Sequence, residues 1–220
     1  MNIYHGSKRI IKEPIPKGSD PHNDYGPAFY LTLDLDSAKS WACKNDSVGI
    51  VNKYSVEKRN FEHLKILDLT NKNKYNVLHW IAILMHYRVL DSSFKKNNQL
   101  VLEWLDKYYI DINQYDVVIG FRADDSYFKF PSKFVSNDLA IEDMNEIFLL
   151  GSLGVQYAFI SEKAIKSLKF VSSIECDESF LGHYYSIVKK ASGEFDILLN
   201  RTRDPKKHYV LDLMRKDDER

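Results

Sequence analysis

The sequence predicts an α+β fold built around one main domain. Short apolar segments with a period of two, typical of strands, occur among segments whose apolar residues recur every three or four positions, typical of helices. No internal repeat, low-complexity stretch or linker divides the chain. Its 220 residues are enough for one domain with a sizeable core, and 44% hydrophobic against 28% charged residues is typical of a soluble globular protein.

The first predicted elements are two strands and a helix. Residues 2–5 form the first strand, and the prolines and glycines of residues 12–27 indicate a connection. A second strand follows at residues 28–33. Asp36 is a suitable N-cap for a helix that begins beside it, because apolar residues then recur at helical spacing on one face.

The middle of the chain continues with strands and helices. Alternating apolar residues predict strands at residues 48–56 and 64–69. Helical periodicity predicts helices at residues 77–88 and 98–109. Residues 116–121, DVVIGF, indicate a buried strand because their apolar run is short, β-branched and followed by glycine.

The predicted elements become weaker after Phe170. A strand is expected at residues 154–160 and a short helix at residues 162–168. We therefore assign residues 1–170 to the main domain and residues 171–220 to a C-terminal extension packed on it. The extension ends in MRKDDER, which we expect to be a solvated, charged tail.

Charge and targeting signals narrow the function classes. Lys plus Arg and Asp plus Glu number 31 each, so the formal net charge is zero. Affinity for duplex nucleic acid rests mainly on positive charge, so this balance disfavours it but permits a nucleic-acid substrate held at a local patch. The N-terminus has no apolar signal run, and the longest apolar stretch, near residues 80–85, is too short to span a membrane. We expect a soluble, cytoplasmic protein with no membrane partner.

Cysteine spacing and the standard catalytic motifs exclude further classes. Cys43 and Cys176 lie far apart without metal-ligand spacing, so we expect two reduced thiols and no metal site. The chain has no Gly-rich phosphate loop, HExxH motif or GxSxG elbow. These absences disfavour a P-loop NTPase, a zinc protease of that type and an α/β-hydrolase.

Two segments near the N-terminus carry residues that suit ligand binding. His5, Gly6 and Ser7 end the first strand, where glycine allows close approach of the backbone to a ligand. Tyr30 enters the second strand and offers a flat ring for stacking on a heterocycle. A hydrogen-bonded structural histidine and a core tyrosine are the ordinary alternatives.

Two later segments carry residues that suit catalysis. Asp124 and Asp125 follow the buried strand at its C-terminal end, a common position for functional carboxylates. Gln156 lies among apolar residues of a strand, where a buried amide needs a partner. Turn-forming aspartates and a glutamine with a purely structural hydrogen bond are the alternatives here.

The order of five segments is more specific than any one of them. The chain has YHGS at its start, then DYGPAFYLT, SAKSWA, YDVVIGFRADD and VQYAFISEKAIKSLKF. Over residues 1–170 this order resembles a bacterial family catalogued as a domain of unknown function (number 3990) and related to the ADP-ribosyltransferases. It is also similar to the poly(ADP-ribose) polymerase branch, whose signature is His, Tyr and Glu on three separate strands.

The resemblance implies the ADP-ribosyltransferase fold, in which split mixed β-sheets with flanking helices surround an NAD cleft. It implies that His5 holds the adenosine ribose of NAD and that the backbone of Gly6 pairs with the nicotinamide amide, with Ser7 in the same binding segment. Tyr30 would stack on the nicotinamide ring, and Gln156 falls where that branch has its catalytic glutamate. NAD is then a substrate, and no metal is implied.

Two positions depart from the family pattern: Gln156 replaces the glutamate, and Ala28 stands where glycine is expected. Cleavage of the ribose–nicotinamide bond passes through an oxocarbenium-like state, which a nearby anion stabilises. A charged hydrogen bond contributes about 1.5–3 kcal/mol against about 0.5–1.5 for a neutral one, so the amide lowers the expected rate by about one or two orders of magnitude. Asp124 and Asp125 are carboxylates available to compensate.

The resemblance therefore implies a mono-ADP-ribosyltransferase that uses NAD to modify a macromolecular acceptor. It also implies the toxin of a bacterial toxin–antitoxin or phage-defence system, with a small neutralising antitoxin as partner. Two alternatives stay open. The amide at Gln156 suits an NAD-binding module without transferase activity, and the acceptor could be a nucleic acid instead of a protein.

Overall fold

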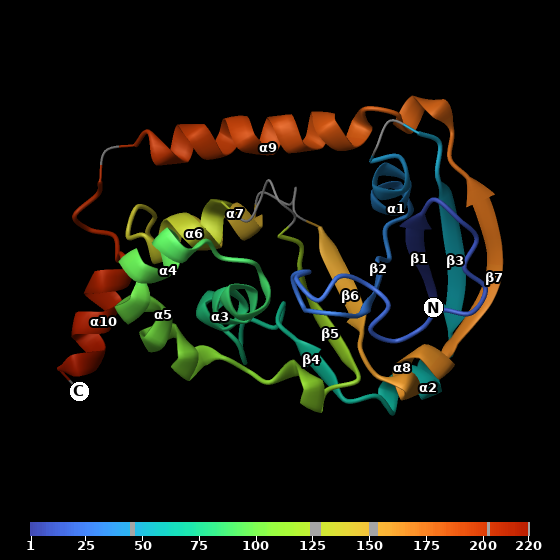
Figure 1. Ribbon diagram of the computed structural model, residues 1–220, viewed down its shortest axis with the longest axis horizontal. Helices are drawn as coiled ribbons and strands as arrows, with labels where there is room; N and C mark the ends of the chain where they lie inside the picture. Colours follow the sequence, from blue (N-terminus) through green and yellow to red (C-terminus); the bar gives the residue numbers. More distant parts are fainter. Residues whose placement is uncertain (45–46, 124–128, 150–153, 202, 220) are drawn as a thin grey trace.

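The computed structural model describes residues 1–44, 47–123, 129–149, 154–201 and 203–219. Within these ranges the chain has the predicted α+β class. Two β-sheets lie next to each other, and the helices gather mainly around the four-stranded one (Figure 1).

The first sheet is antiparallel and has the strand order β1-β3-β7. β1 (Asn2–Ser7) pairs with β3 (Ile50–Val56), and β3 pairs with β7 (Leu168–Glu175). Met1 and Val56 exchange both backbone hydrogen bonds, at 2.6 and 2.9 Å. In an antiparallel pair, residues that hydrogen-bond to the partner strand alternate with residues whose N–H and carbonyl point away from it. Because Met1 bonds to β3, the even-numbered residues of β1 direct their backbone groups away from β3.

The second sheet is mixed and has the order β2-β6-β5-β4. β2 (Phe29–Leu31) and β5 (Val117–Phe121) both run antiparallel to β6 (Val155–Phe159). β4 (Ile66–Asp68) runs parallel to β5. The first four residues of β5 are buried, as its continuous apolar run predicted.

A β-bridge joins the two sheets. The N–H of Tyr4 donates to the carbonyl of Thr32 at 2.8 Å, and the N–H of Thr32 donates to the carbonyl of Tyr4 at 2.9 Å. The pairing stops after this bridge: on this side of β1, no described strand pairs with Gly6. The sheets therefore part beyond the bridge, and we call this place the split.

Two helices pack against different sheets. α1 (Leu35–Ala42) packs on β1 and β3, and α3 (Val77–Tyr87) has most of its side chains buried beside the second sheet. The other helices are α2 (Lys58–Glu62), α4 (Ser92–Asn97), α5 (Gln99–Leu105), α6 (Lys129–Val135), α7 (Ile141–Leu149), α8 (Glu162–Lys166), α9 (His183–Leu199) and α10 (Val210–Asp218).

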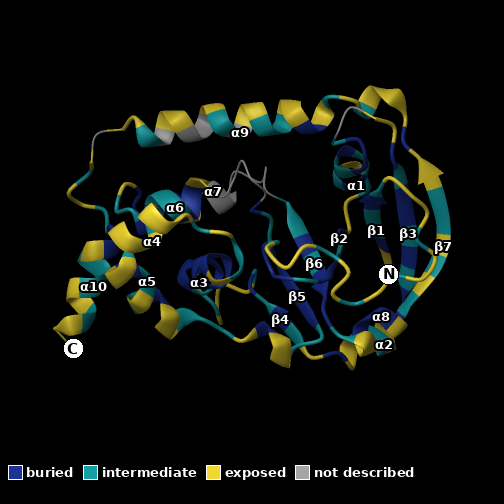
Figure 2. Ribbon diagram, viewed as in Figure 1, coloured by how far each residue is buried: buried dark blue, intermediate teal, exposed yellow. Residues whose placement is uncertain are grey.

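Two larger clusters of buried side chains hold these layers together. Figure 2 shows buried residues along α3 and the strands of both sheets. One is centred on α3 and includes Trp80, Leu84 and Phe134. The other includes Ile3 of β1 and Phe159 of β6, so it packs one sheet against the other. Each large apolar side chain contributes about 1.5–3 kcal/mol on burial, which is enough for this second cluster to keep the two sheets in a defined arrangement beside the split.

Two predicted helix boundaries were wrong. Asp34 caps α1, since its Oδ1 accepts from the N–H of Asp36 at 3.1 Å and its Oδ2 from the Ser37 hydroxyl at 2.6 Å. Asp36 lies in the first turn, where a negative charge suits the helix dipole. The helix expected to reach residue 109 ends at Leu105 and continues as a 3₁₀ turn to Tyr108.

The C-terminal part makes contact with the rest of the chain at several places. β7 crosses residue 170 and completes the first sheet. His183, at the start of α9, has Nδ1 2.7 Å from the hydroxyl of Ser40 in α1. The expected charged tail is largely helical, in α10, where Asp217 accepts a hydrogen bond from the indole of Trp104 at 3.1 Å. α9 runs across the molecule between these two contact regions (Figure 1).

Candidate functional site

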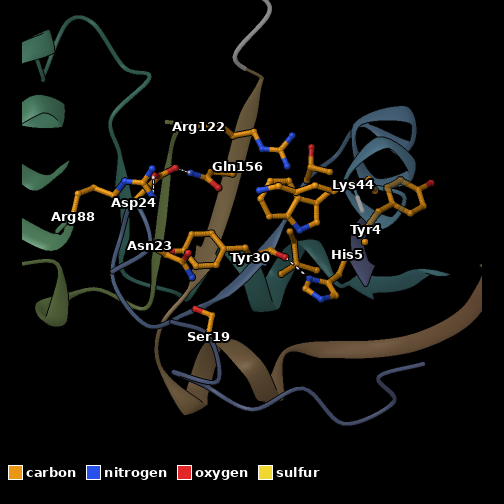
Figure 3. A pocket seen from close by; sticks show the side chains of 15 residues that line it. Tyr4, His5, Ser19, Asn23, Asp24, Tyr30, Lys44, Arg88, Arg122 and Gln156 are labelled. Carbon is orange, nitrogen blue, oxygen red and sulfur yellow. Dashed lines mark hydrogen bonds and ion pairs between the residues drawn. The ribbon is translucent and has the colours of Figure 1, made fainter. Parts of the chain in front are cut away.

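A pocket of about 300 Å³ lies at the split between the two sheets. Its lining side chains converge from segments far apart in the sequence (Figure 3). β1 contributes His5 and Gly6, β2 contributes Tyr30, and β6 contributes Gln156. The structure thus brings four of the predicted site residues to one cavity.

His5 is held in a defined orientation. Its Nδ1 lies 2.7 Å from the carbonyl oxygen of Tyr30, and its ring stacks on Phe29 with centroids 4.4 Å apart. A carbonyl only accepts hydrogen bonds, so Nδ1 carries the proton and Nε2 is the acceptor of the neutral ring. Burial lowers the pKa of His5, and this outweighs the opposite effect of the bond to Tyr30. The neutral form therefore predominates at neutral pH.

Tyr30 has its hydroxyl anchored in the protein. Its Oη donates to the carbonyl of Gly26 at 2.7 Å and accepts from the N–H of Tyr25 at 3.0 Å. Burial first, and the negative charge of Asp24 second, raise the pKa of Tyr30 well above its ordinary value. The hydroxyl stays protonated, and what the residue offers a ligand in the pocket is its ring.

The backbone of Gly6 points toward the pocket. Gly6 lies two residues after Tyr4 in the same strand, and the backbone groups of Tyr4 bond to Thr32, the residue that follows β2. The N–H and carbonyl of Gly6 therefore point to the same side as those of Tyr4. Glycine is also required for packing, because a Cβ there would lie 2.2 Å from the carbonyl oxygen of Ala38 in α1. Ser7 is outside the pocket lining, and its hydroxyl accepts from Asn52 Nδ2 at 3.0 Å.

The amide of Gln156 is oriented by two acceptors. Its Nε2 lies 2.8 Å from Asp24 Oδ2 and 3.4 Å from the carbonyl of Phe121. Since a carboxylate and a carbonyl only accept, the NH₂ end must face them. The amide oxygen, Oε1, therefore faces the pocket (Figure 3).

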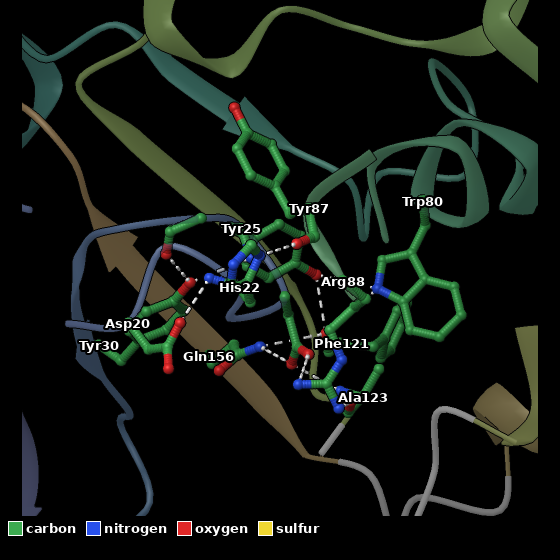
Figure 4. Close-up of polar contacts among 12 residues, drawn as sticks. Asp20, His22, Tyr25, Tyr30, Trp80, Tyr87, Arg88, Phe121, Ala123 and Gln156 are labelled. Carbon is green, nitrogen blue, oxygen red and sulfur yellow. Dashed lines mark hydrogen bonds and ion pairs between the residues drawn. The ribbon is translucent and has the colours of Figure 1, made fainter. Parts of the chain in front are cut away.

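Asp24 is a buried carboxylate in the pocket wall. Its Oδ2 also accepts from the N–H of Ala123 at 2.8 Å, and its Oδ1 lies 3.7 Å from Arg88 Nη1. Arg88 Nη2 donates to the carbonyl of Ala123 at 2.9 Å. These bonds connect the loop before β2 to the residues after α3 and β5 (Figure 4).

Tyr25 anchors the same loop on β5. Its hydroxyl donates to the carbonyl of Phe121 at 2.7 Å and accepts from the indole of Trp80 at 3.0 Å. Gly120 leaves the necessary space, because a Cβ there would lie 2.1 Å from the Tyr25 hydroxyl. Breaking a buried bond of this kind costs about 1–3 kcal/mol, so the loop holds Asp24 in a defined place.

Two cations contact one indole ring at the pocket. Lys44 Nζ lies 4.5 Å and the Arg122 guanidinium 4.9 Å from the centroid of Trp41. Lys44 also lies 5.0 Å from the ring of Tyr184 in α9. Cation–π contacts contribute about 0.5–2 kcal/mol each. They neutralise no charge, so both cations can attract an anionic ligand.

The family described as "Protein of unknown function (DUF3990)" matches residues 1–170. The chain belongs to this family. The DUF3990 segment contains the whole pocket lining, from Tyr4 to Gln156, whereas Tyr184 lies beyond it. No curated protein and no solved structure matches the chain.

The DUF3990 segment also supplies pocket residues that sequence analysis missed. Those with a charged or indole side chain are Asp24, Trp41, Lys44, Arg88 and Arg122. A signal was present for three of them, because Asp24 opens DYGPAFYLT, Trp41 lies in SAKSWA and Arg122 lies in YDVVIGFRADD. Lys44 and Arg88 stand outside these segments, and local periodicity does not indicate that they meet.

The remaining predicted features lie elsewhere. Asp124 and Asp125 fall outside the residues that the structure describes. Cys43 and Cys176 are buried and not disulfide-bonded. In the described part of the chain, no three His, Cys, Asp or Glu side chains gather as a metal ion would require. None of the described helices has both the length and the apolar character needed to cross a membrane.

Proposed function

We propose that this chain is a mono-ADP-ribosyltransferase that binds NAD in the pocket at the split. One observation carries the proposal: His5, Gly6, Tyr30 and Gln156, from three strands of two sheets, line a single cavity. The resemblance described above assigns these four positions to NAD from the order of motifs alone. Their convergence in space supports that assignment, because sequence order does not require it.

The exposed atoms suit the nicotinamide half of NAD. The ring of Tyr30 offers a flat surface for the nicotinamide ring. The outward-facing N–H and carbonyl of Gly6 match the acceptor and donor of a carboxamide. His5 Nε2, an acceptor in the neutral ring, suits a ribose hydroxyl. Lys44 and Arg122 then provide positive charge for the diphosphate.

The proposed reaction breaks the bond between ribose C1′ and the nicotinamide nitrogen. The electron pair of that bond leaves with nicotinamide, and the acceptor's nucleophile forms the new bond to C1′ while losing a proton. Positive charge develops on the ribose as the bond breaks. Gln156 Oε1 presents negative partial charge toward it, and the Asp24 carboxylate lies directly behind that amide.

Titration calorimetry with NAD, followed by incubation with labelled NAD and a bacterial lysate, tests this proposal. We expect saturable NAD binding and label in high-molecular-weight material. Loss of that label on protease digestion identifies a protein acceptor, and loss on nuclease digestion identifies a nucleic acid. Failure of the wild-type protein to bind NAD would refute the proposal.

A second candidate function is an NAD-binding module without transferase activity. The observation that favours it is the uncharged amide of Gln156 at the position facing the ligand. NAD binding without label transfer and without release of free nicotinamide would select this candidate over the first.

We also propose that the activity serves a cytoplasmic toxin that a small antitoxin neutralises. Support comes from the family resemblance and from the macromolecular acceptor that it implies. Expression of the wild type alone should slow bacterial growth, and expression of Tyr30→Ala should not. Normal growth with abundant soluble wild-type protein would contradict the toxin role while leaving the transferase proposal to the labelling experiment.

A further inference from the structure

A carboxylate stands behind the amide that faces the pocket. Asp24 Oδ2 accepts from Gln156 Nε2 at 2.8 Å, and the two residues are 7% and 8% exposed. Their side chains meet at the pocket wall, with the amide oxygen turned away from Asp24 (Figure 3). The two residues come from different structural units, the loop before β2 and strand β6.

We propose that Asp24 is a positioning residue for Gln156. It holds the amide with Oε1 toward the ligand and places a negative charge one hydrogen bond behind that oxygen. The proposal rests on the proposed function for the identity of the ligand, NAD, but the contact itself can be tested without NAD.

The orientation of the amide follows from its two acceptors. Turning it over would set Oε1 against Asp24 and the carbonyl of Phe121, and neither atom could then donate a hydrogen bond to it. A buried acceptor that loses its hydrogen-bond donor costs about 1–3 kcal/mol, which is well above the thermal energy of about 0.6 kcal/mol. Gln156 is therefore held with its oxygen toward the pocket before any ligand arrives.

The charge of Asp24 acts within the same pocket. The negative charge of Asp24 is the second cause, after burial, that raises the pKa of both Tyr25 and Tyr30. In a low-dielectric interior, a charged acceptor polarises the group that donates to it. The bond from Gln156 to Asp24 thus makes Oε1 more negative and supplies part of the charge that a glutamate would carry itself.

Gln156→Glu is a sensitive probe of this contact. The new carboxyl can replace the amide only when protonated, because its O–H then donates to Asp24 and its carbonyl oxygen faces the pocket. Two carboxylates this close repel each other, so we expect the pKa of the pair to be raised at least about one unit above the ordinary glutamate value of about 4.3. An acid with a raised pKa in the folded state stabilises the fold at low pH, and that stabilisation is lost as pH rises through the raised value.

The primary measurement is the melting temperature against pH without NAD. The melting temperature of Gln156→Glu should fall relative to wild type as pH rises from the ordinary glutamate value to the raised one, so the midpoint of this change lies above the ordinary value. In the double variant Asp24→Asn/Gln156→Glu the like charge is gone, and the midpoint, which lies about halfway between the unfolded and folded pKa values, should fall by at least about half a pH unit. Equal midpoints in the single and double variants would overturn the proposal.

Asp20→Asn/Gln156→Glu is the matched control. Asp20 lies in the same loop but is exposed and outside the pocket, and its Oδ1 accepts from the N–H of His22 at 2.8 Å (Figure 4). This variant should keep the midpoint of Gln156→Glu. A midpoint lowered equally by Asp20→Asn and Asp24→Asn would indicate a general charge effect and would also contradict the proposal.

The NAD measurements test what the contact does for the ligand. Asp24→Asn keeps an oxygen that accepts from Gln156 and from the N–H of Ala123 but removes the charge. With activity corrected for folded fraction, we expect kcat to fall about five- to tenfold with KM changed less than about twofold. An unchanged kcat would overturn the charge effect. Absence of NAD binding in the wild type would refute the proposed function, and the melting experiment would still decide the role of Asp24.

Discussion

At the residue scale, three site side chains have a polar atom bonded to the protein, and this leaves one defined group of each facing the pocket. His5 uses Nδ1, Tyr30 uses its hydroxyl and Gln156 uses Nε2 for these anchoring bonds. The groups that remain are a ring nitrogen, a ring face and an amide oxygen. Such preorganisation lowers the entropic cost of binding, because the protein's own hydrogen bonds order these side chains before a ligand binds.

Two substitutions of His5 separate its anchoring atom from its ligand-facing atom. His5→Asn places an amide N–H near the position of Nδ1 and removes Nε2, whereas His5→Gln places an acceptor near Nε2 and loses the bond to Tyr30. We expect His5→Asn to keep its melting temperature within about 2–4 °C of wild type and to weaken NAD binding about two- to tenfold. His5→Gln should show the opposite pattern. Equal NAD affinity in both variants, measured by calorimetry, would exclude a ligand contact through Nε2.

At the element scale, the pocket depends on the close approach of α1 to β1. Ala38, Trp41 and Lys44 line the pocket from this helix and the residue after its C-cap. The approach is possible because Gly6 has no side chain toward α1. Any shift of α1 therefore moves the cation-bearing side of the pocket relative to Tyr30.

Gly6→Ala tests this dependence. The new Cβ would lie 2.2 Å from the Ala38 carbonyl, so the helix must move, and we expect a loss of about 1–3 kcal/mol in the free energy of unfolding together with weaker NAD binding. Gly193→Ala in α9 is the matched control, because a Cβ there meets no described atom within 4 Å and a helical Ala is favoured by about 1 kcal/mol over Gly. Chemical denaturation measures both. A Gly6→Ala protein as stable as wild type would show that α1 does not constrain the site.

At the scale of the whole molecule, the C-terminal part shares its core with the family segment. Val210 of α10 is fully buried in the cluster centred on α3. Asp217 accepts a hydrogen bond from Trp104, and β7 supplies the outer strand of the first sheet. These contacts predict that residues 171–220 unfold together with residues 1–170.

Val210→Ala tests this cooperativity. Removing two methyl groups from the core should lower the free energy of unfolding by about 1–3 kcal/mol and leave one transition for the whole chain. Leu211→Ala is the control, since Leu211 is 44% exposed and its truncation should change stability by less than about 0.5 kcal/mol. Two separate transitions in calorimetry, with only the smaller one shifted by Val210→Ala, would show independent folding of the C-terminal part.

The sequence by itself determined the α+β class, the helix α3 and most strands, because apolar periodicity is a local property that each segment carries. Motif order also singled out His5, Gly6, Tyr30 and Gln156, which the structure brings to one pocket. The strand β7 was missed because its apolar and polar residues alternate only weakly. It forms a strand in the structure because it pairs with β3 along its length.

Only the tertiary structure decided which atom of each residue faces the pocket and which carboxylate lies beside Gln156. The sequence pointed to Asp124 and Asp125, whereas the described pocket contains Asp24, 132 positions before Gln156. That contact exists because buried bonds from Tyr25 hold its loop on β5. No local periodicity encodes such a contact, since it depends on how two segments distant in sequence pack against the same strand.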